Sequence, residues 1–391
     1  MRVYFDNNAT TPLNREVLDE MLPYFCEKCG NAMSIHEFGK ETSEAIELAR
    51  KRVAVALDCE PEEVIFTSGG SESNNTVLKG IDPIPYGKGH IITSTIEHPA
   101  VIEPCQYLSK HGIDITYIRV DKFGLVNPDD IKRAIRPDTS LISIMFANNE
   151  VGTIEPIEDI AKIAKEAGVP FHTDAVQAVG KIPVSVSKMG IDMLSLSAHK
   201  FNGPKGVGAL IVRKPLKRKI TPLIHGGGHE GGKRASTHNV PGIVGLGKAI
   251  ELATANREEE MSQVKRLRDI LHKKIVETVP DIELFGHPEK RLPTTLDIAF
   301  HYVEGESIQL QLSLRGVAVS TGSACASGKL EPSHVLIEMG YPHEIAQGAV
   351  RFSLGRGNTE EEVNYVASVL PEIIENLRRM SVLTPKNYFK D

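Results

Sequence analysis

A lysine and an aspartate follow two short apolar segments, where side chains of these types could carry covalent chemistry. Lys200 comes after the apolar run Leu194–Leu196 and just before a Gly/Pro-rich turn, and Asp174 ends another apolar run upstream. A lysine amine can bind an aldehyde as a Schiff base, and a carboxylate can keep a pyridine nitrogen protonated, so that the ring takes up electrons. An opposite charge at contact distance shifts a pKa by about 1–3 units, which maintains that protonation. The pair therefore predicts the chemistry of pyridoxal 5'-phosphate (PLP).

Three more polar side chains occupy comparable places in the sequence. His98 comes shortly after an apolar segment, and it could stack on a cofactor ring and move protons, because the pKa of histidine lies near neutrality. Asn149 follows the strongest apolar run of the chain, and a short amide there could donate to a phenolic oxygen or to a substrate carboxylate. Gln177, one turn after Asp174, could reach the phenolic oxygen. The plain alternatives are a structural histidine, an Asn-rich turn and a surface carboxylate.

Two glycine-rich segments could bring backbone close to a ligand. In Thr67–Asn75, two glycines follow an apolar run and precede a predicted helix, whose free N–H groups could bind a phosphate together with Ser71. The segment Gly226–Thr237 is dense in glycine, and so many glycines are costly in conformational entropy unless something approaches them closely. A plain strand-to-helix turn and a flexible linker are the respective alternatives.

A cysteine and an arginine in the second half of the chain complete the set of reactive candidates. Cys325 lies among very small residues, which leaves a thiol accessible and makes it the best nucleophile of the five cysteines. Arg351 lies in an apolar segment, where a guanidinium fork suits a substrate carboxylate. Cys26 and Cys29 form a C-x-x-C pair at a predicted helix end, without a second such pair, so a structural interpretation outweighs metal or redox use.

Composition excludes several classes of protein. The chain has 391 residues, which favours two domains, and its net charge of −6 comes from interspersed acids and bases without a basic block. We therefore expect neither nucleic-acid binding nor membrane association. The start of the chain is polar almost at once, so we expect no signal peptide. Few and scattered cysteines fit a reducing compartment, and we expect a cytoplasmic location.

Short apolar runs alternate with helical patterns, which predicts an α/β fold with a mostly parallel sheet flanked by helices. After this region, a helical pattern from Ile243 to about Thr278 bridges to a smaller α+β part. We expect a large cofactor-binding domain over residues 13–255, and a small domain, made of 1–12 and 256–391, that carries the cysteine loop. The predicted strands are Val64–Thr67, His90–Thr93, Ile115–Arg119, Leu141–Phe146, Pro170–His172, Met193–Ser197 and Gly208–Val212. In such sheets, ligands bind beyond the carboxyl ends of the strands, where the candidate residues lie.

As a set, these motifs resemble the cysteine desulfurases of the NifS/IscS-like kind, which belong to the class V aminotransferase family of fold-type I PLP enzymes. The resemblance covers nearly the whole chain. It departs from the usual Arg-Ser-Gly-Thr pattern at Arg234-Ala235-Ser236-Thr237. The residues that carry it are Phe5–Pro12, Ser68–Asn75, Glu97-His98, Ala147–Glu150, Asp174–Gln177, Ser197–Lys200, His225–Glu230, Ser323–Cys325 and Arg351.

The resemblance implies a role for each site residue. Lys200 is expected to bind the cofactor covalently and to move protons, and His98 is expected to stack on the ring as an acid and base. Cys325 is expected to attack the substrate sulfur. The resemblance assigns the pyridinium to Asp174, the phenolic oxygen to Gln177, the phosphate to Gly70, Ser71, Ser197, His199 and a second subunit's Thr237, and the substrate carboxylate to Asn149 and Arg351.

The implied activity is conversion of L-cysteine to L-alanine through a PLP ketimine. The sulfur is captured as a persulfide on Cys325 and passed to iron–sulfur cluster assembly or another acceptor. The resemblance also implies a homodimer, an iron–sulfur scaffold protein as partner and, at most, a transient cluster ligand at Cys325. Two alternatives remain open. One is a selenocysteine lyase or another fold-type I PLP enzyme, and the other is a non-catalytic iron–sulfur scaffold partner.

Overall fold

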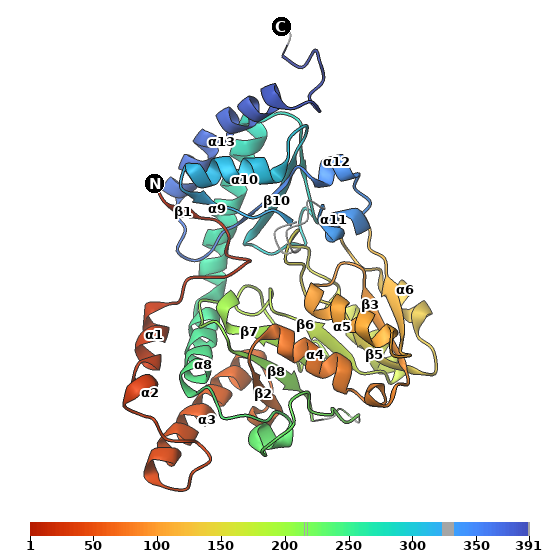
Figure 1. The fold of residues 1–391 in the computed structure, drawn as a ribbon, viewed down its shortest axis with the longest axis vertical. Helices are drawn as coiled ribbons and strands as arrows, with labels where there is room; N and C mark the ends of the chain where they lie inside the picture. The colour runs from red at the N-terminus through yellow and green to blue at the C-terminus, as the bar shows by residue number, and fades with distance from the viewer. Residues whose placement is uncertain (215, 217, 323–331, 390–391) are drawn as a thin grey trace.

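The computed structural model describes residues 1–214, 216, 218–322 and 332–389. Cys325, the predicted nucleophile, lies outside the described residues. The molecule is elongated, with a seven-stranded sheet in one part and a three-stranded sheet in the other (Figure 1). The two chain ends both belong to the part with the three-stranded sheet.

The larger sheet has the strand order β2-β8-β7-β6-β5-β3-β4, and all its strands run in one direction except β8, which is antiparallel to both neighbours. The prediction of a mostly parallel sheet is therefore confirmed. Its strands are β2 (Val64–Thr67), β3 (His90–Ser94), β4 (Asp114–Ile118), β5 (Thr139–Ser143), β6 (Phe171–Asp174), β7 (Met193–Ser197) and β8 (Gly208–Val212).

Both faces of this sheet are apolar, because its alternating side chains pack under helices on each side. Ile91, Leu141 and Leu210 face one layer, and their chain neighbours Ile92 and Ile142 face the other. The first layer consists of α4 (Gly70–Gly80) and α5 (Pro99–Ser109). The second consists of α3 (Glu37–Leu57), α6 (Pro128–Ala134), α7 (Ile157–Ala167) and α8 (Val240–Ala255), with α1 (Arg15–Met21) and α2 (Pro23–Cys26) beside α8.

The ends of β3, β4, β5 and β6 differ from those of the predicted strands by one to three residues, and the long helix after the sheet is divided in two. The strand expected to run to Phe146 ends at Ser143, although the amides of Ile144 and Phe146 still bond to carbonyls of the next strand, so the chain stays extended. The long helix expected up to Thr278 is interrupted at Asn256, whose φ of −116° is not helical. Beyond the break, α9 (Arg257–Thr278) leaves the large sheet and packs against the C-terminal helix.

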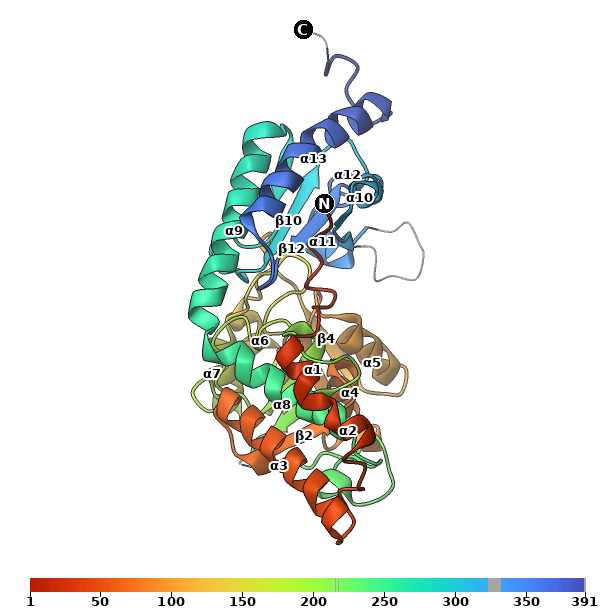
Figure 2. The ribbon, with the colours of Figure 1, turned by 90° about the vertical axis from the view of Figure 1, so that its left-hand side faces the viewer.

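The smaller part has an antiparallel sheet of order β12-β10-β9, covered by α9, α10 and α13 around a separate apolar cluster (Figure 2). Helix α13 begins with a capping box between Thr359 and Glu362. The elements of this part are β1 (Val3–Tyr4), β9 (Ile282–Leu284), β10 (Thr295–Phe300), α10 (Gly305–Leu314), β11 (Val317–Ala318), α11 (His334–Glu338), α12 (His343–Ala346), β12 (Ala349–Ser353) and α13 (Glu360–Met380).

The N-terminal segment crosses from the smaller part to the larger one. Strand β1 pairs with β11, and the chain then runs past the carboxyl ends of the large sheet before α1 begins. We propose the division into 13–255 on one side and 1–12 with 256–391 on the other, because the helix break at Asn256 and the separate apolar clusters support it.

Candidate active site

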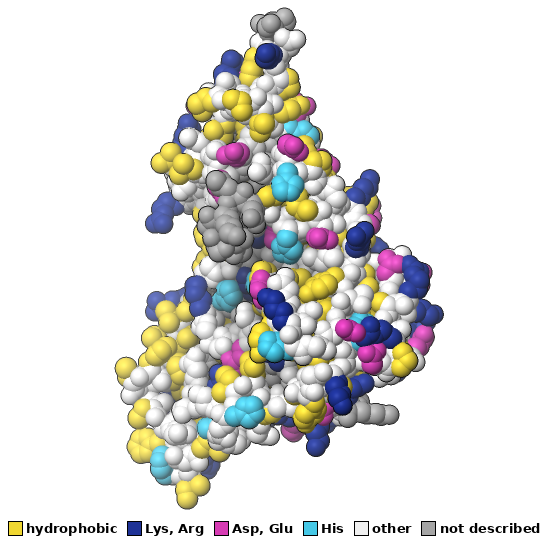
Figure 3. Space-filling model, turned by 45° about the vertical axis from the view of Figure 1, so that its right-hand side comes forward, with side chains coloured by type: hydrophobic (Ala, Val, Ile, Leu, Met, Phe, Trp, Pro, Cys, Tyr) yellow, Lys and Arg dark blue, Asp and Glu magenta, His cyan; other side chains and the backbone are white. Residues whose placement is uncertain are grey.

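A cavity of about 290 Å³ lies beyond the carboxyl ends of β6 and β7, at the start of α4 and α5. The surface is indented at the waist between the two parts of the molecule, and histidine side chains lie near this indentation (Figure 3). Of the predicted site residues that the structure describes, all line the cavity except Thr237. The lining is Asn8, Ala9, Gly70, Ser71, Asn74, His98, Ala100, Met145, Ala147, Asn149, Asp174, Val176, Gln177, Ser197, His199, Lys200 and Arg351.

Lys200 reaches the cavity from the end of strand β7. The strand ends at Ser197, and a single 3₁₀ turn, Ala198–Lys200, brings the lysine side chain to the wall. Its Nζ donates to the carbonyl oxygens of Asn8 (2.6 Å) and Ala9 (2.8 Å). The amine is thus held against the N-terminal segment at the edge of the sheet, in reach of a ligand in the cavity.

Asp174 ends the neighbouring strand β6 and is 7 % exposed. Its Oδ2 accepts from the amide of Asn74 (2.6 Å), and its Oδ1 accepts from the backbone N–H of Val176 (3.0 Å). Hydrogen bonds to a carboxylate stabilise its ionised form. The arrangement therefore offers an oriented negative charge to a protonated ring nitrogen.

His98 caps α5, and this contact determines its tautomer. The backbone N–H of Ala100 donates to His98 Nδ1 (3.0 Å), so the ring proton is assigned to Nε2. Burial lowers the pKa of His98, the nearby charges of Lys200 and His334 act in the same direction, and Asp174 opposes them. The imidazole is therefore neutral at neutral pH, with one transferable proton on Nε2.

Behind His98 lies a buried acid, Glu97. One oxygen of its carboxyl accepts from the hydroxyl of Ser94 (2.7 Å) and from the N–H of Met145 (2.8 Å). The other oxygen has no hydrogen-bond partner among the described residues. Burial raises the pKa of Glu97 to about 8, so this carboxyl is protonated at neutral pH.

The start of α4 is built for close approach of an anion. The helix begins at Gly70, after Gly69 with φ of +155°, and its first N–H groups face the cavity beside Ser71 and Ser197. A Cβ at Gly70 would lie 2.6 Å from a methyl carbon of Val176, in the wall of the cavity, so any larger residue there would require Val176 to shift. His199 lies beside them, and burial, with the charge of Lys200 in second place, lowers its pKa to about 4.

These residues fit PLP. The helix start with its hydroxyl groups suits the phosphate, Asp174 suits the pyridinium, and Lys200 suits the aldehyde carbon. The fit rests on the donors and charges that line the cavity and on the glycine that leaves room at the helix start.

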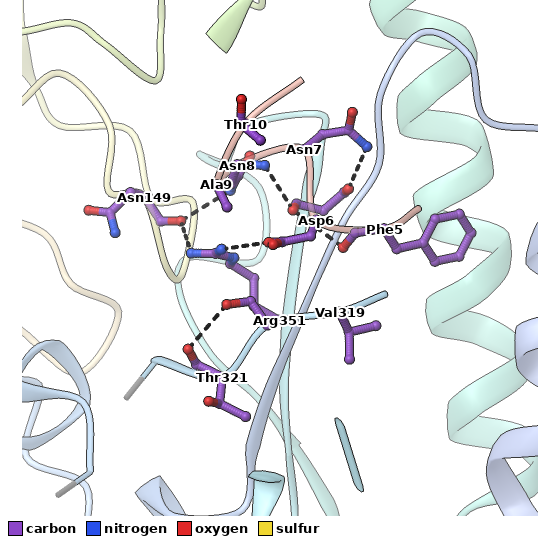
Figure 4. A network of polar contacts seen from close by, with 12 residues as sticks. Phe5, Asp6, Asn7, Asn8, Ala9, Thr10, Asn149, Val319, Thr321 and Arg351 are labelled. Atoms are coloured by element: carbon purple, nitrogen blue, oxygen red, sulfur yellow. Dashed lines mark hydrogen bonds and ion pairs between the residues drawn. The ribbon is translucent and has the colours of Figure 1, made fainter. Parts of the chain in front are cut away.

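Arg351, from β12 of the smaller part, closes the opposite wall (Figure 4). Its guanidinium donates to Asp6 Oδ1 (3.0 Å) and to the carbonyl of Asn149 (3.0 Å). The carbonyl of Asn149 also accepts from the side-chain amide of Asn8 (3.1 Å). We call the set Asp6, Asn8, Asn149 and Arg351 the junction. The side-chain amide of Asn149 was predicted to bind the ligand; Asn149 lines the cavity, and its backbone carbonyl also holds the junction together.

A second buried acid lies behind the junction. Asp297 stands opposite Arg351 in the ladder between β10 and β12, and it is 1 % exposed. Burial and the neighbouring Glu150 raise the pKa of Asp297 to about 7, although Arg351 and Arg291 act against this shift. This carboxyl therefore changes its protonation near neutral pH.

Thr237 does not line the cavity of its own chain; its side chain is exposed. It follows Ser236, whose φ of +106° lies in the region that favours glycine, at the position where the resembled pattern has glycine. The loop is anchored by Glu230, which accepts from Arg50, from the N–H of Phe66 and from His238. Burial raises the pKa of Glu230, but these donors outweigh it and lower the pKa to about 2.

No role was predicted from the sequence for Asn8, Asn74 or Lys181, which contact the site residues. Asn8 and Asn74 lie inside motifs that carried the resemblance, but no role was derived for them. Lys181 lies beneath the cavity, and its type and position resemble those of an ordinary surface lysine. The spacing of four residues between Gln177 and Lys181 was the only available signal, because it allows the two side chains to meet, as they do here.

Cys26 and Cys29 are both exposed free thiols. Within the described residues, no group of His, Cys, Asp and Glu side chains is arranged to hold a metal ion. A search of the same residues finds no helix with the length and apolarity needed to cross a membrane.

Comparison with known proteins gives a consistent result. The family described as aminotransferase class-V matches residues 3–366. Proteins described as "Cysteine desulfurase IscS" are 55% identical to the chain: that of Methanosarcina thermophila covers 99% of this chain and 95% of its own length, and that of Dictyoglomus turgidum covers 97% and 96%.

Solved structures agree with this result. A structure described as a NifS-like protein has a TM-score of 0.90 at 43% identity, and the match covers 96% of this chain and all of that protein's chain. The structure of a NifS-like protein from Rickettsia africae has a TM-score of 0.87 at 31% identity, with the same coverage of both chains. The cavity has the donors that PLP needs, and the similarity extends over the whole chain. The chain therefore belongs to the class-V aminotransferase family, as a PLP-dependent enzyme of the cysteine desulfurase group.

Proposed function

We propose that this enzyme removes sulfur from L-cysteine, leaves L-alanine, and holds the sulfur as a persulfide on Cys325. One observation carries the proposal: a single cavity gathers Lys200, Asp174, His98 and Arg351 in a chain that shares about half its residues with cysteine desulfurases along its whole length. When bound, PLP supplies an electron sink that weakens bonds at the Cα and Cβ of an amino acid.

The protein's own groups have distinct tasks. Arg351 binds the substrate carboxylate with its guanidinium, while Asp6 and the carbonyl of Asn149 hold that guanidinium in place. Lys200 takes the proton from Cα as general base. His98 carries a single proton on Nε2 and faces the same cavity, so it donates and recovers protons without becoming an imidazolium.

The sulfur step balances without another reactant. The thiolate of Cys325 attacks the substrate sulfur, the Cβ–S bond breaks, and its electron pair stays on Cβ, which takes up a proton to give the methyl group of alanine. L-cysteine and one enzyme thiol thus become L-alanine and one enzyme persulfide. An acceptor thiol that attacks the persulfide takes this sulfur as a new persulfide without a change of its oxidation state, and sulfide is released only when a reductant supplies two electrons.

We also propose the partners and the location. The sulfur acceptor is an iron–sulfur scaffold protein, as the IscS description of the relatives suggests, and the enzyme works in the cytoplasm as a homodimer. The exposed Thr237 supports the dimer, because a threonine outside its own cavity is available to complete the phosphate site of a second subunit.

The test is incubation of the purified, PLP-loaded protein with L-cysteine and a reductant, with alanine and sulfide measured together. Equal amounts of the two products are expected. The Cys325→Ala variant should keep the visible absorption of bound PLP and lose sulfur transfer to an acceptor protein. Cys29→Ala, at an exposed thiol outside the cavity, serves as the matched control and should transfer sulfur normally. Full transfer by the Cys325→Ala variant would remove Cys325 from the mechanism.

A further inference from the structure

A buried amine lies directly beneath the cavity without lining it. Lys181 follows β6 by two turns and is 4 % exposed. Its Nζ donates to the side-chain oxygen of Gln177 (2.6 Å) and to that of Asn8 (3.2 Å). Neither acceptor carries a charge, so both contacts are to neutral amides. A buried lysine without an ion-pair partner in these contacts is costly, which calls for a function beyond packing.

The contacts of Lys181 determine the orientation of the Gln177 amide. An amide oxygen and an amide nitrogen have nearly the same shape, and only their partners distinguish them. Because Lys181 takes the oxygen, the Gln177 nitrogen lies on the other side, where one N–H donates to the carbonyl of Asn8 (2.9 Å). The second N–H of this nitrogen remains for the cavity that Gln177 lines.

Lys181 orients Asn8 in the same way. The Asn8 side-chain oxygen accepts from Lys181, and its nitrogen donates to the carbonyl of Asn149 and to the hydroxyl of Thr295 (2.8 Å). The backbone carbonyl of Asn8 accepts from both Gln177 and Lys200. One buried amine thus fixes two amides that touch the Schiff-base lysine and the junction.

The positive groups around Lys181 lie on several elements. Burial lowers its pKa well below the usual value, and the charges of Lys200, Arg351 and Arg356 act in the same direction. A lysine ammonium has three donors and no acceptor, so it can face only the oxygen of each amide, as both contacts here show.

We propose that Lys181 is a positioning residue that keeps an N–H of Gln177 directed into the cavity, toward the phenolic oxygen of PLP. This inference rests on the proposed function, which places PLP in the cavity. A donor to a phenolate stabilises the ionised oxygen and favours loss of the proton that the bound cofactor shares with its lysine nitrogen. Without Lys181 only the carbonyl of Asn8 holds the Gln177 amide, so a turned amide, whose oxygen repels the phenolate, becomes accessible.

The experiment is a pH titration of the visible absorption of PLP bound to the Lys181→Met variant. The midpoint should rise by about one to two pH units relative to the unaltered protein, the shift expected from the loss of one hydrogen bond to a charged group. The Gln177→Met variant should show the same rise, and the double variant should show no further rise, because the two residues act as one unit. Lys165→Met, at an exposed lysine of α7, should leave the midpoint unchanged.

The outcomes of this titration distinguish a failure of the inference from a failure of the proposed function. A midpoint that stays in place in Lys181→Met, or a double variant in which the two shifts add, overturns the inference while leaving the proposed function intact. If the unaltered protein acquires no visible band with PLP, the proposed function itself fails. Should Lys181→Met not fold, Lys181→Leu, which also lacks a donor, is titrated in its place, and an unchanged midpoint there overturns the inference equally.

Discussion

The two walls of the cavity position their cationic side chains, Lys200 and Arg351, in different ways. On one wall, which we call the floor, Asp174, Ser197 and Lys200 stand at the ends of the adjacent strands β6 and β7. On the other wall, the junction holds Arg351 through contacts to Asp6 and Asn149, which lie 345 and 202 residues away in the sequence. The floor is a property of one sheet, whereas the junction exists only where two sheets and the N-terminal segment meet.

The difference has a consequence for function. The floor is rigid because Asp174 and Ser197 belong to ladders within a core that is apolar on both faces, and Lys200 follows Ser197 by a single 3₁₀ turn. The junction joins both parts of the molecule, so any movement of one part relative to the other changes the position of Arg351. We therefore expect changes at the floor to abolish chemistry, and changes at the junction to weaken substrate binding.

The largest expected effect is at the floor, in the Lys200→Ala variant. Turnover of L-cysteine should fall by about 10⁴-fold or more, because the variant loses both a general base and the covalent attachment of the cofactor. Lys205→Ala, at an exposed lysine of the same turn, is the control and should retain activity. Borohydride reduction of the PLP-loaded protein followed by peptide mapping checks the cause: the label should lie on Lys200. A label on Lys205 would contradict this assignment.

At the junction, Arg351→Ala should lower kcat/KM for L-cysteine by about 10- to 150-fold, chiefly through KM. This range corresponds to the loss of one charge-assisted hydrogen bond to the substrate carboxylate. Asp6→Asn keeps an acceptor beside the guanidinium, so its effect should have the same direction and be smaller. Steady-state kinetics with both variants measure the difference. If Arg351→Ala lowered kcat as strongly as Lys200→Ala does, the contrast between floor and junction would be wrong.

The same contrast explains what could be predicted from the sequence. All seven strands of the large sheet were predicted, because each is a short apolar run between turn signals. Once those strands are placed, the rule that ligands bind at carboxyl ends brings Asp174 and Lys200 together. No local sequence pattern indicates the contacts of the junction. Asp6 and Asn8 lie in a polar segment without periodicity, and their contacts depend on how two sheets pack. Arg351 was predicted as a site residue from its residue type, but its hydrogen bond to Asp6 was not predicted.

The burial of Lys181 could not be predicted from the sequence either. Its buried position follows from the N-terminal segment, which covers it through Asn8, more than 170 residues away. Periodicity within the turn after β6 gives no sign of that cover. Similarly, the end of β5 was misplaced because Ile144 and Phe146 stay extended and hydrogen-bonded without being counted in a strand.

The two buried acids near the cavity extend the comparison to stability, and Glu97, behind His98, has the larger expected effect. In the unfolded chain this carboxyl loses its proton near pH 4.5, whereas in the folded protein it keeps the proton up to about pH 8. Between these values the unfolded state binds fewer protons, so stability falls as pH rises, by up to about 1.4 kcal/mol per pH unit. Glu97→Gln should remove this contribution, because the amide replaces the protonated carboxyl. Urea unfolding at a series of pH values measures it, and equal pH profiles for the two proteins would refute it.

Asp297, which lies behind the junction, should show the same behaviour over a narrower pH interval. Its carboxyl titrates near pH 3.8 when unfolded and near pH 7 when folded, because Arg351 and Arg291 offset part of the effect of burial. Stability should therefore fall between these values and level off above pH 7, while the contribution of Glu97 continues to about pH 8. Asp297→Asn should flatten the profile only below pH 7. Because ionised Asp297 attracts Arg351, the KM for L-cysteine should also change near pH 7 in the unaltered enzyme and not in Asp297→Asn. A KM that is independent of pH across this range in both proteins would show that the junction does not sense this acid.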